Sequence, residues 1–215
     1  MDTMEQLRQV VITGDWQAAP DLTRQALNAG HEARMILNAL VSGMDVVSAE
    51  WTVGNMFIPD VLLAAKAMHA GMDVLRPHLS AMDIRLRGTV VIGTVKGDLH
   101  DIGKSLVAMM LEGAGFEVHD LGVDVSPAKF VAAAKDHQSD IVAMSALLTT
   151  TLPFMRDTIR SLEEAGLRES VQVLVGGAPV TPPFADSIGA DGFAPDGATA
   201  VVKARELIDA IRAKA

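Results

Sequence analysis

The sequence contains no cysteine and no tyrosine among its 215 residues, and aromatic residues of all kinds make up only 4% of it. Without cysteine, the chain has no disulfide, thiol nucleophile, iron–sulfur cluster or cysteine-bound zinc. We expect a reducing, cytoplasmic location, which agrees with this composition. The 12 methionines are expected to fill core space that aromatic rings usually occupy.

Positive charge is also scarce. Lysine and arginine number 18 against 27 aspartates and glutamates, which gives a formal net charge of −9. A general nucleic-acid-binding protein would be basic, so we expect no nucleic-acid partner. No apolar run approaches the ~20 residues that cross a bilayer, so we expect no membrane segment. Hydrophobic residues nevertheless make up 49% of the chain, enough to form a sizeable core.

The hydrophobic pattern divides the chain into two parts. Residues 1–80 show helical periodicity alone and predict a bundle of four helices, the last running from Pro59 to about Arg76. The charged segment 81–88 is the predicted linker. Residues 89–215 alternate five short strands with helices, which predicts an α/β domain with a five-stranded parallel sheet covered on both faces, as in flavodoxin-like and Rossmann-like folds. The predicted strands are Thr89–Val95, Val118–Leu121, Ile141–Ser145, Val171–Val175 and Gly192–Ala194.

Ligands of such sheets bind beyond the carboxyl ends of the strands, and the loop after the first predicted strand is the most informative. Its end, Gly103-Lys104-Ser105, resembles the end of the phosphate-binding motif G-x-x-x-x-G-K-[ST]. The first glycine of that motif would stand at position 98, so Gly97 lies one position too early. Asp98 occupies the glycine position, and its carboxylate would repel a phosphate. A phosphorylated receiver domain does not fit either, because Ser145 ends the third strand where an aspartate is needed. On spacing alone, His100 is best explained as a loop histidine hydrogen-bonded to Asp98.

The same pair also suits a metal, because a carboxylate can hold one ring nitrogen while the other binds the ion. No second histidine is near, so His100 would suffice only if a macrocycle supplied the other ligands. Two more strand ends carry small residues that a ligand could approach closely. They are Ser145, Thr149, Thr150 and Thr151 after the third strand, and Gly176 and Gly177 after the fourth. A helix cap and a tight turn would explain these residues as well.

Together, these pieces resemble the signature of the cobalamin-binding proteins of methyl-transfer systems: D-x-H-x-x-G, 41 residues, S-x-L, 26 to 28 residues, and G-G. Here the pieces are Asp98-x-His100-x-x-Gly103, Ser145-x-Leu147 and Gly176-Gly177, separated by residues 104–144 (41 positions) and 148–175 (28 positions). The helical half, with Gly54–Pro59 and Ala64–Met68, is similar to the four-helix cap of methionine synthase. It is also similar to the cap of the small corrinoid proteins of methanol, methylamine and betaine demethylation. The resemblance covers nearly the whole chain.

The resemblance implies a cobalamin bound base-off/His-on, with His100 as the lower axial ligand of cobalt and Asp98 orienting its ring. Thr151 stands where methionine synthase has a serine that continues this relay. Phe57, with Leu62 and Leu63 beside it, matches the cap aromatic over the methyl-bearing face. The other residues implied to contact the cofactor are Asp101, Ile102, Gly103, Ser145, Leu147, Thr149, Gly176 and Gly177.

The implied function is to carry a methyl group on cobalt between a substrate:corrinoid methyltransferase and a methylcorrinoid:acceptor methyltransferase. The acceptor would be tetrahydrofolate or a thiol, and a reductive activation protein is a third implied partner. Such a chain is a non-autonomous component of one-carbon metabolism. The alternative is a cobalamin-binding sensor or storage protein without methyl-transfer partners. A flavodoxin-like enzyme without a corrin would need other catalytic residues, and the remaining histidines show no pairing that supplies them.

Overall fold

A computed structural model of the chain describes residues 2–81 and 86–214. The chain divides into two compact units: residues 1–86 together with 112–115, and residues 87–111 together with 116–215. Most of the predicted linker, residues 82–85, lies outside the described residues. The predicted domain boundaries therefore stay predictions.

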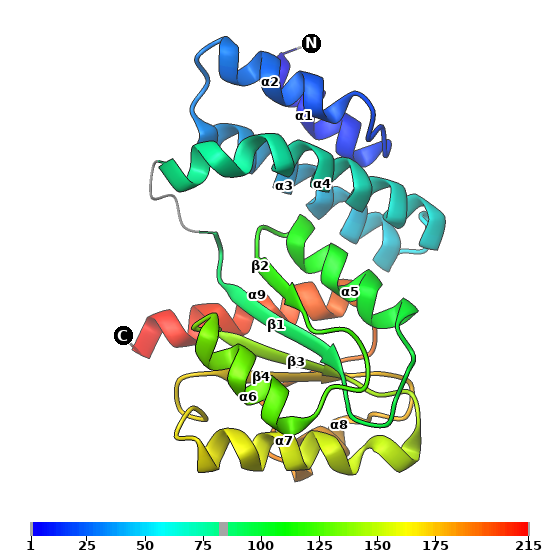
Figure 1. Cartoon of the computed structure of the whole chain (residues 1–215). Coiled ribbons are helices and arrows are strands. Elements are labelled where there is room, and N and C mark those ends of the chain that lie inside the picture. The colour runs from blue at the N-terminus through cyan, green and yellow to red at the C-terminus, as the bar shows by residue number, and fades with distance from the viewer. Residues whose placement is uncertain (1, 82–85, 215) are drawn as a thin grey trace. The chain divides into compact units, whose positions relative to one another are not determined.

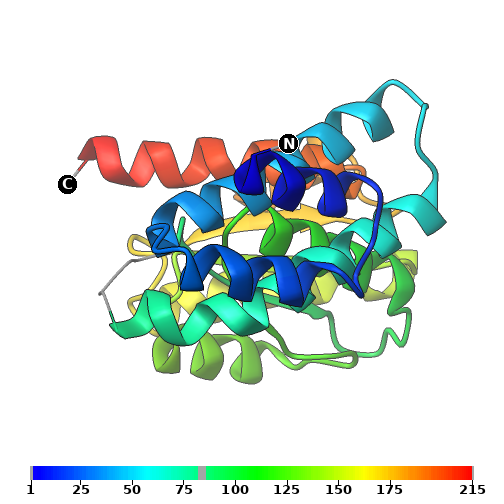
Figure 2. The ribbon, with the colours of Figure 1, turned by 90° about the horizontal axis from the view of Figure 1, so that it is seen from above.

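Within residues 2–81 the first unit contains four helices (Figures 1 and 2). They are α1 (Thr3–Ile12), α2 (Ala19–Asn28), α3 (Ala33–Thr52) and α4 (Ile58–Ala81). The inner face of α3 buries Ile36, Leu40 and Val47, which recur at the spacing expected of an amphipathic helix. A Cβ added at Gly43 of the same helix would lie 2.7 Å from the Cβ of Val11 in α1, so these two helices pack very closely.

The last helix of this unit is longer than predicted. The expectation that it ends near Arg76 is wrong, because α4 continues through Pro77 to Ala81. A proline inside a helix removes one backbone hydrogen bond, which is why the sequence favoured an end there. Leu75 and Leu79 on either side of Pro77 are only 0% and 3% exposed. Burial of these side chains outweighs the missing hydrogen bond.

The second unit is built on a parallel sheet of five strands, which confirms the predicted fold class. The strands are β1 (Thr89–Thr94), β2 (Glu117–Asp120), β3 (Ile141–Ser145), β4 (Gln172–Gly176) and β5 (Gly192–Ala194). Their order is β2-β1-β3-β4-β5, with every neighbouring pair parallel. Each end differs from its predicted position by at most one residue, because buried β-branched runs mark these strands clearly in the sequence.

Helices cover both faces of the sheet (Figure 1). They are α5 (Ile102–Gly113), α6 (Pro127–Asp136), α7 (Pro153–Glu164), α8 (Pro182–Ser187) and α9 (Gly197–Lys214), and η1 (Thr149–Thr151) is a short 3-10 turn. On one face, Val91 and Val173 join a core with Phe130 of α6 and Met155 of α7. Helices α5 and α9 cover the other face, and α9 contacts β4 and β5.

The buried strands of the sheet unit set its stability. We expect Val142→Ala, at a fully buried position of β3, to lower the free energy of unfolding by about 1.5 to 3 kcal/mol, because it removes apolar contacts and leaves a cavity. Val202→Ala, at a position of α9 that is 53% exposed, is the matched control and should change it by less than about 0.5 kcal/mol. Urea unfolding followed by circular dichroism measures both. Equal losses in the two variants would contradict this core assignment.

Candidate functional site

The carboxyl ends of four neighbouring strands lie level with one another. Thr94 of β1 pairs with Ser145 of β3, Ser145 with Gly176 of β4, and Gly176 with Ala194 of β5. The loops that follow β1, β3 and β4 therefore leave the sheet at the same edge. This is where ligands of parallel sheets usually bind, and it brings together the three sequence pieces that were expected to meet.

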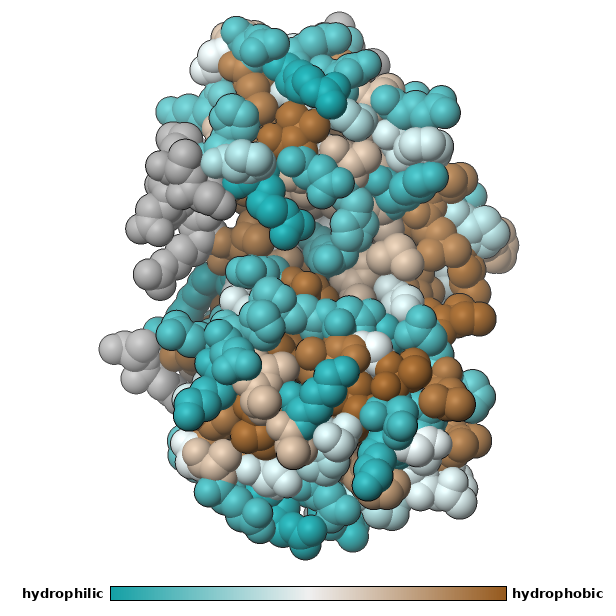
Figure 3. Space-filling view, in the orientation of Figure 1, coloured by the Kyte–Doolittle hydropathy of each residue, from teal (hydrophilic) through white to brown (hydrophobic). Residues whose placement is uncertain are grey.

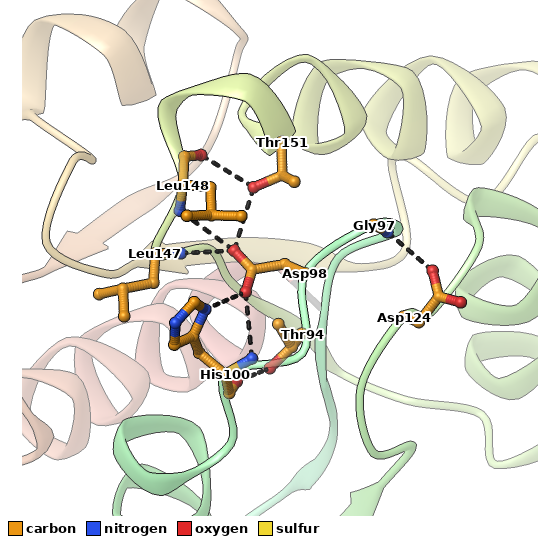
Figure 4. Close-up of polar contacts among 8 residues, drawn as sticks. All are labelled: Thr94, Gly97, Asp98, His100, Asp124, Leu147, Leu148 and Thr151. Carbon is orange, nitrogen blue, oxygen red and sulfur yellow. Dashed lines mark hydrogen bonds and ion pairs between the residues drawn. The ribbon is translucent and has the colours of Figure 1, made fainter.

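Asp98, in the loop after β1, is the centre of this edge. Its side chain is fully buried, and its two oxygens accept hydrogen bonds from two loops (Figure 4). Oδ1 accepts from the backbone N–H of His100 at 3.1 Å and faces the ring Nδ1 of His100 at 2.7 Å. Oδ2 accepts from the backbone N–H groups of Leu147 and Leu148, at 2.7 and 3.1 Å. The carboxylate thus joins the loop after β1 to the loop after β3.

Thr151, in η1, reaches the same carboxylate. Its Oγ1 lies 3.1 Å from Asp98 Oδ2 and 2.8 Å from the carbonyl oxygen of Leu148. A hydroxyl has one proton, so it donates to one of these acceptors at a time. The predicted contact between Thr151 and Asp98 is therefore present, and its role in a relay stays a prediction.

The charge of Asp98 follows from these contacts. Burial raises the pKa of the carboxyl, but hydrogen bonds from the backbone N–H of Leu147, the ring and backbone N–H of His100, and the backbone N–H of Leu148 lower it by more. The pKa of Asp98 consequently lies well below its ordinary value. The group is an anion at neutral pH and a strong hydrogen-bond acceptor for the ring of His100.

His100 presents its other ring nitrogen away from Asp98. With the Nδ1 proton donated to the carboxylate, the lone pair of the neutral ring is on Nε2, where it can bind a metal. The side chain is 51% exposed, so Nε2 is open to a ligand from outside. Among the described residues, no group of three or more histidine, aspartate or glutamate side chains could hold a metal ion. The remaining ligands of a metal at His100 would have to belong to the group that brings it.

Apolar side chains of the segments that follow β1 and β3 are exposed near this histidine. Leu99, in the loop after β1, and Ile102, the first residue of α5, are 72% and 84% exposed. Leu147 and Leu148, in the loop after β3, are 45% and 41% exposed. Figure 3 shows hydrophobic side chains, in brown, exposed among hydrophilic ones, in teal. Exposed apolar side chains around a polar group are typical of a site that binds a large, mostly apolar ligand. This donor set and its surroundings fit a metal-containing macrocycle.

Two further predicted contact residues, Asp101 and Gly103, lie at the start of α5. Lys104 Nζ lies 2.8 Å from Asp101 Oδ1 and also contacts Asp120 at the end of β2. The hydrogen bond from Lys104 lowers the pKa of Asp101. The Lys104 side chain is 1% exposed, so it is occupied by carboxylates and is not free to bind a phosphate. A Cβ added at Gly103 would meet no atom within 4 Å, which leaves open space at that position.

The glycine pair after β4 is required by the protein's own backbone. Gly177 has a φ of +118°, and an added Cβ would lie 1.9 Å from the carbonyl oxygen of Ala146. A Cβ at Gly176 would lie 2.6 Å from the carbonyl oxygen of Ala194. Side chains are thus excluded here by the close approach of neighbouring strand ends. A contact of these glycines with a cofactor stays a prediction.

Two predicted contact residues remain, one in each unit. Thr149 is exposed and opens η1. Phe57 precedes α4 in the helical unit, where its backbone N–H donates to Asp60 Oδ2 at 2.9 Å and its side chain is 67% exposed. The other exposed apolar residues in and beside the turn between α3 and α4 are Val53, Ile58, Leu62 and Leu63.

Sequence reasoning did not single out several residues that hold the site together. Thr94 Oγ1 donates to the carbonyl oxygen of His100 at 2.8 Å, and Asp124 Oδ1 accepts from the N–H of Gly97 at 2.7 Å. Leu148 was missed as well. A backbone donor such as Leu148 N–H has no signature in a sequence, and the contacts of Thr94 and Asp124 form only when the chain is folded.

Comparison with known families agrees with this geometry. A family model described as a B12 binding domain matches residues 88–205, and a second, also described as a B12 binding domain, matches residues 3–76. In the described part of the chain, no helix has the length and apolar character needed to cross a membrane.

The similarity of this chain to known proteins, in sequence and in structure, extends over almost its whole length. Dimethylamine corrinoid protein 1 of Methanosarcina acetivorans is 44% identical over 210 residues, covering 96% of this chain and 98% of that protein. A cobalamin-binding protein from Desulfitobacterium hafniense has a similar structure, with a TM-score of 0.78 and 32% identity over 96% of this chain and 98% of its own. The methanol:cobalamin methyltransferase complex MtaBC from Methanosarcina barkeri matches with a TM-score of 0.86 and 28% identity, over 96% of this chain and 80% of that one.

The buried carboxylate predicts a pH-dependent loss of stability on substitution. Asp98→Asn should lower the free energy of unfolding of the protein without ligand by about 2 to 4 kcal/mol at pH 7, because charge-assisted hydrogen bonds are lost. The folded-state pKa is lowered, so the stabilisation is complete above about pH 5 and is lost as the pH falls below the unfolded value of ~3.9. The difference in the free energy of unfolding between wild type and Asp98→Asn should therefore become smaller in acid. Urea unfolding at several pH values measures it.

Asp209→Asn, at an exposed position of α9, is the control for this series. The free energy of unfolding of this variant should match that of the wild type at every pH of the series. A gap between Asp98→Asn and wild type that stays constant from pH 7 into acid would contradict an ionised, stabilising Asp98.

Proposed function

The chain belongs to the family of B12-binding proteins, and we propose that it is a corrinoid protein that carries a methyl group between two methyltransferases. The observation on which this rests is the arrangement of His100: one ring nitrogen is held by a buried, ionised Asp98, and the other is open among exposed apolar side chains. Relatives that are corrinoid proteins of methylamine systems, similar along almost the full length, support the same function.

His100 is the proposed lower axial ligand, binding through Nε2 in place of the cofactor's own base. The corrinoid supplies the cobalt to which the methyl group is attached. Asp98 fixes the tautomer of the ring and makes Nε2 a stronger donor, as carboxylates behind metal-bound histidines generally do. Thr151 adjusts the hydrogen bonding of Asp98 by donating to Oδ2 or to Leu148.

The other predicted contact residues are proposed to hold the body and the tail of the cofactor. Leu147 and Ile102 provide exposed apolar surface for the corrin ring, flanked by Asp101 and Thr149. The tail would run past positions where side chains are small or missing, so that the backbone can be approached closely. These positions are Gly103, Ser145, Gly176 and Gly177.

The helical unit is proposed to shield the methyl-bearing face of the cofactor. The exposed Phe57, with Leu62 and Leu63 on α4, provides the apolar surface for this role. A methyl group that is covered cannot react, so this unit has to move aside when a partner binds. Such motion would let the protein protect the methyl group between transfers.

The proposed partners are a substrate-specific methyltransferase, a methyltransferase that passes the methyl group to tetrahydrofolate or a thiol, and a reductive activation protein. Relatives named as dimethylamine corrinoid proteins favour a methylamine as the methyl donor of the first partner.

The axial role of His100 is tested with purified protein incubated with hydroxocobalamin and desalted. Wild type should retain about one corrinoid per chain with a shifted visible spectrum. His100→Ala should lose the shift and bind the corrinoid about 10- to 100-fold more weakly, as is typical when metal-site residues are changed. His31→Ala, in the helical unit between α2 and α3, is the control and should match the wild type. A spectrum of His100→Ala identical to that of wild type would refute the axial ligation.

Methyl transfer separates a carrier from a sensor or storage protein. With a dimethylamine-type methyltransferase, dimethylamine and reductant, the corrinoid-loaded protein should be methylated and should then pass the methyl group to a thiol or to tetrahydrofolate when the second methyltransferase is added. His100→Ala should be slower by about 10- to 100-fold. A loaded wild type that accepts no methyl group from methylamine or methanol methyltransferases would favour the sensor or storage alternative.

A further inference from the structure

The short segment from Gly97 to His100 is held from outside by Asp124, a residue 27 positions from Gly97 in the loop after β2 (Figure 4). The Asp124 carboxylate accepts a hydrogen bond from the N–H of Gly97 at 2.7 Å. The backbone N–H of Asp124 donates to the carbonyl oxygen of Asp98 at 3.0 Å. One residue therefore binds the chain on both sides of the Gly97–Asp98 peptide bond.

The backbone conformation of Asp124 is unusual and is matched to these contacts. Its φ is +52°, in the left-handed region that side chains other than those of Asn and Asp rarely adopt. Gly97, its partner, has a φ of +78°. The next residue, Val125, pairs with Val95 and donates its N–H to the carbonyl oxygen of Thr94 at 2.9 Å. Asp124 thus sits at a fixed point beside the end of β1.

The position of the His100 ring depends on this backbone. The ring is half exposed and is held by its contact with Asp98, while the backbone of His100 is held by Thr94 and Asp98. A metal ligand has to be placed within about 0.5 Å and 10–20° of the productive geometry. Displacement of Gly97 and Asp98 would move the carboxylate and, with it, the ring.

We propose that Asp124 is a positioning residue, which fixes the Gly97–Asp98 turn so that the Nε2 of His100 is presented for axial ligation. This inference rests on the proposed function of His100. Asp124 acts through the loop and does not itself touch the ring. Its effect should therefore be seen in the mobility of the loop without cofactor and in the strength of the axial bond with it.

Three substitutions separate the side chain from the backbone conformation. Asp124→Gly removes the acceptor and tolerates a positive φ, so it tests the carboxylate without adding strain. Asp124→Asn keeps an acceptor oxygen and also tolerates this conformation, so this variant should retain the loop protection and the axial bond of the wild type. Gln138→Gly is the control, because Gln138 is exposed and is the other described non-glycine residue with a positive φ, at 48°.

The first readout is amide hydrogen exchange of the Gly97–His100 segment in the protein without corrinoid. Loss of a hydrogen bond to a charged group should speed exchange in Asp124→Gly by about 10- to 100-fold. The exchange rate of this segment in Asp124→Asn should stay within about 10-fold of the wild-type rate, and the rate in Gln138→Gly should equal the wild-type rate.

The second readout is the cyanide concentration at which half of the bound cyanocobalamin converts to the dicyano form, followed in the visible spectrum. Cyanide competes with the axial histidine, so a weaker axial bond lowers this concentration. We expect a fall of about 3- to 10-fold in Asp124→Gly, recovery in Asp124→Asn, and no change in Gln138→Gly.

The outcomes separate this inference from the proposed function. If wild type and His100→Ala convert at the same cyanide concentration, the axial role of His100 fails and the inference fails with it. If those two differ while Asp124→Gly matches wild type, the axial role stands and the inference is overturned. A loss in Asp124→Gly that Asp124→Asn does not recover would also overturn it, because the acceptor would not be the cause.

Discussion

The Asp98 carboxylate is a buried charge, and a buried charge is tolerated only where hydrogen bonds replace the water it has lost. Its donors come from its own loop and from a loop about fifty residues further along the chain, after β3. The charge therefore ties the two loops together, and the loops set the direction of the His100 ring. Stability of the sheet edge and orientation of the His100 ring depend on the same five hydrogen bonds.

The parallel sheet makes this arrangement possible. Because β1, β3 and β4 are adjacent and end level with one another, their loops meet at one edge without long connections. Gly176 and Gly177 allow the backbones there to approach more closely than any side chain would permit. The fold thus contributes position, while the loops contribute the chemical groups. For a large ligand that contains its own metal, the protein has to provide three things at this edge: one nitrogen as a metal ligand, an apolar surface, and space for the ligand's tail.

Much of this could be predicted from the sequence, for reasons that are visible in particular residues. Buried β-branched runs identified the strands, and the spacing of the Asp98, Ser145 and Gly176 pieces indicated that the three loops meet. Pro77 misled the prediction of α4, because burial of Leu79 depends on tertiary packing. Lys104 suggested a phosphate-binding loop, yet its partner Asp120 becomes near only through the pairing of β1 with β2. Asp124 is an ordinary turn residue in the sequence, and its contact with Gly97 follows from the same pairing.

The central claim is that the lower axial ligand is a nitrogen of the protein. The most direct test is the electron paramagnetic resonance spectrum of the protein loaded with cobalamin and reduced to cobalt(II), after growth with ¹⁵N-labelled histidine and unlabelled cofactor. Our account predicts that the axial nitrogen splitting changes from the triplet of ¹⁴N to the doublet of ¹⁵N. A splitting that remains a triplet would show that the cofactor's own base binds the cobalt, and would contradict the role given to His100.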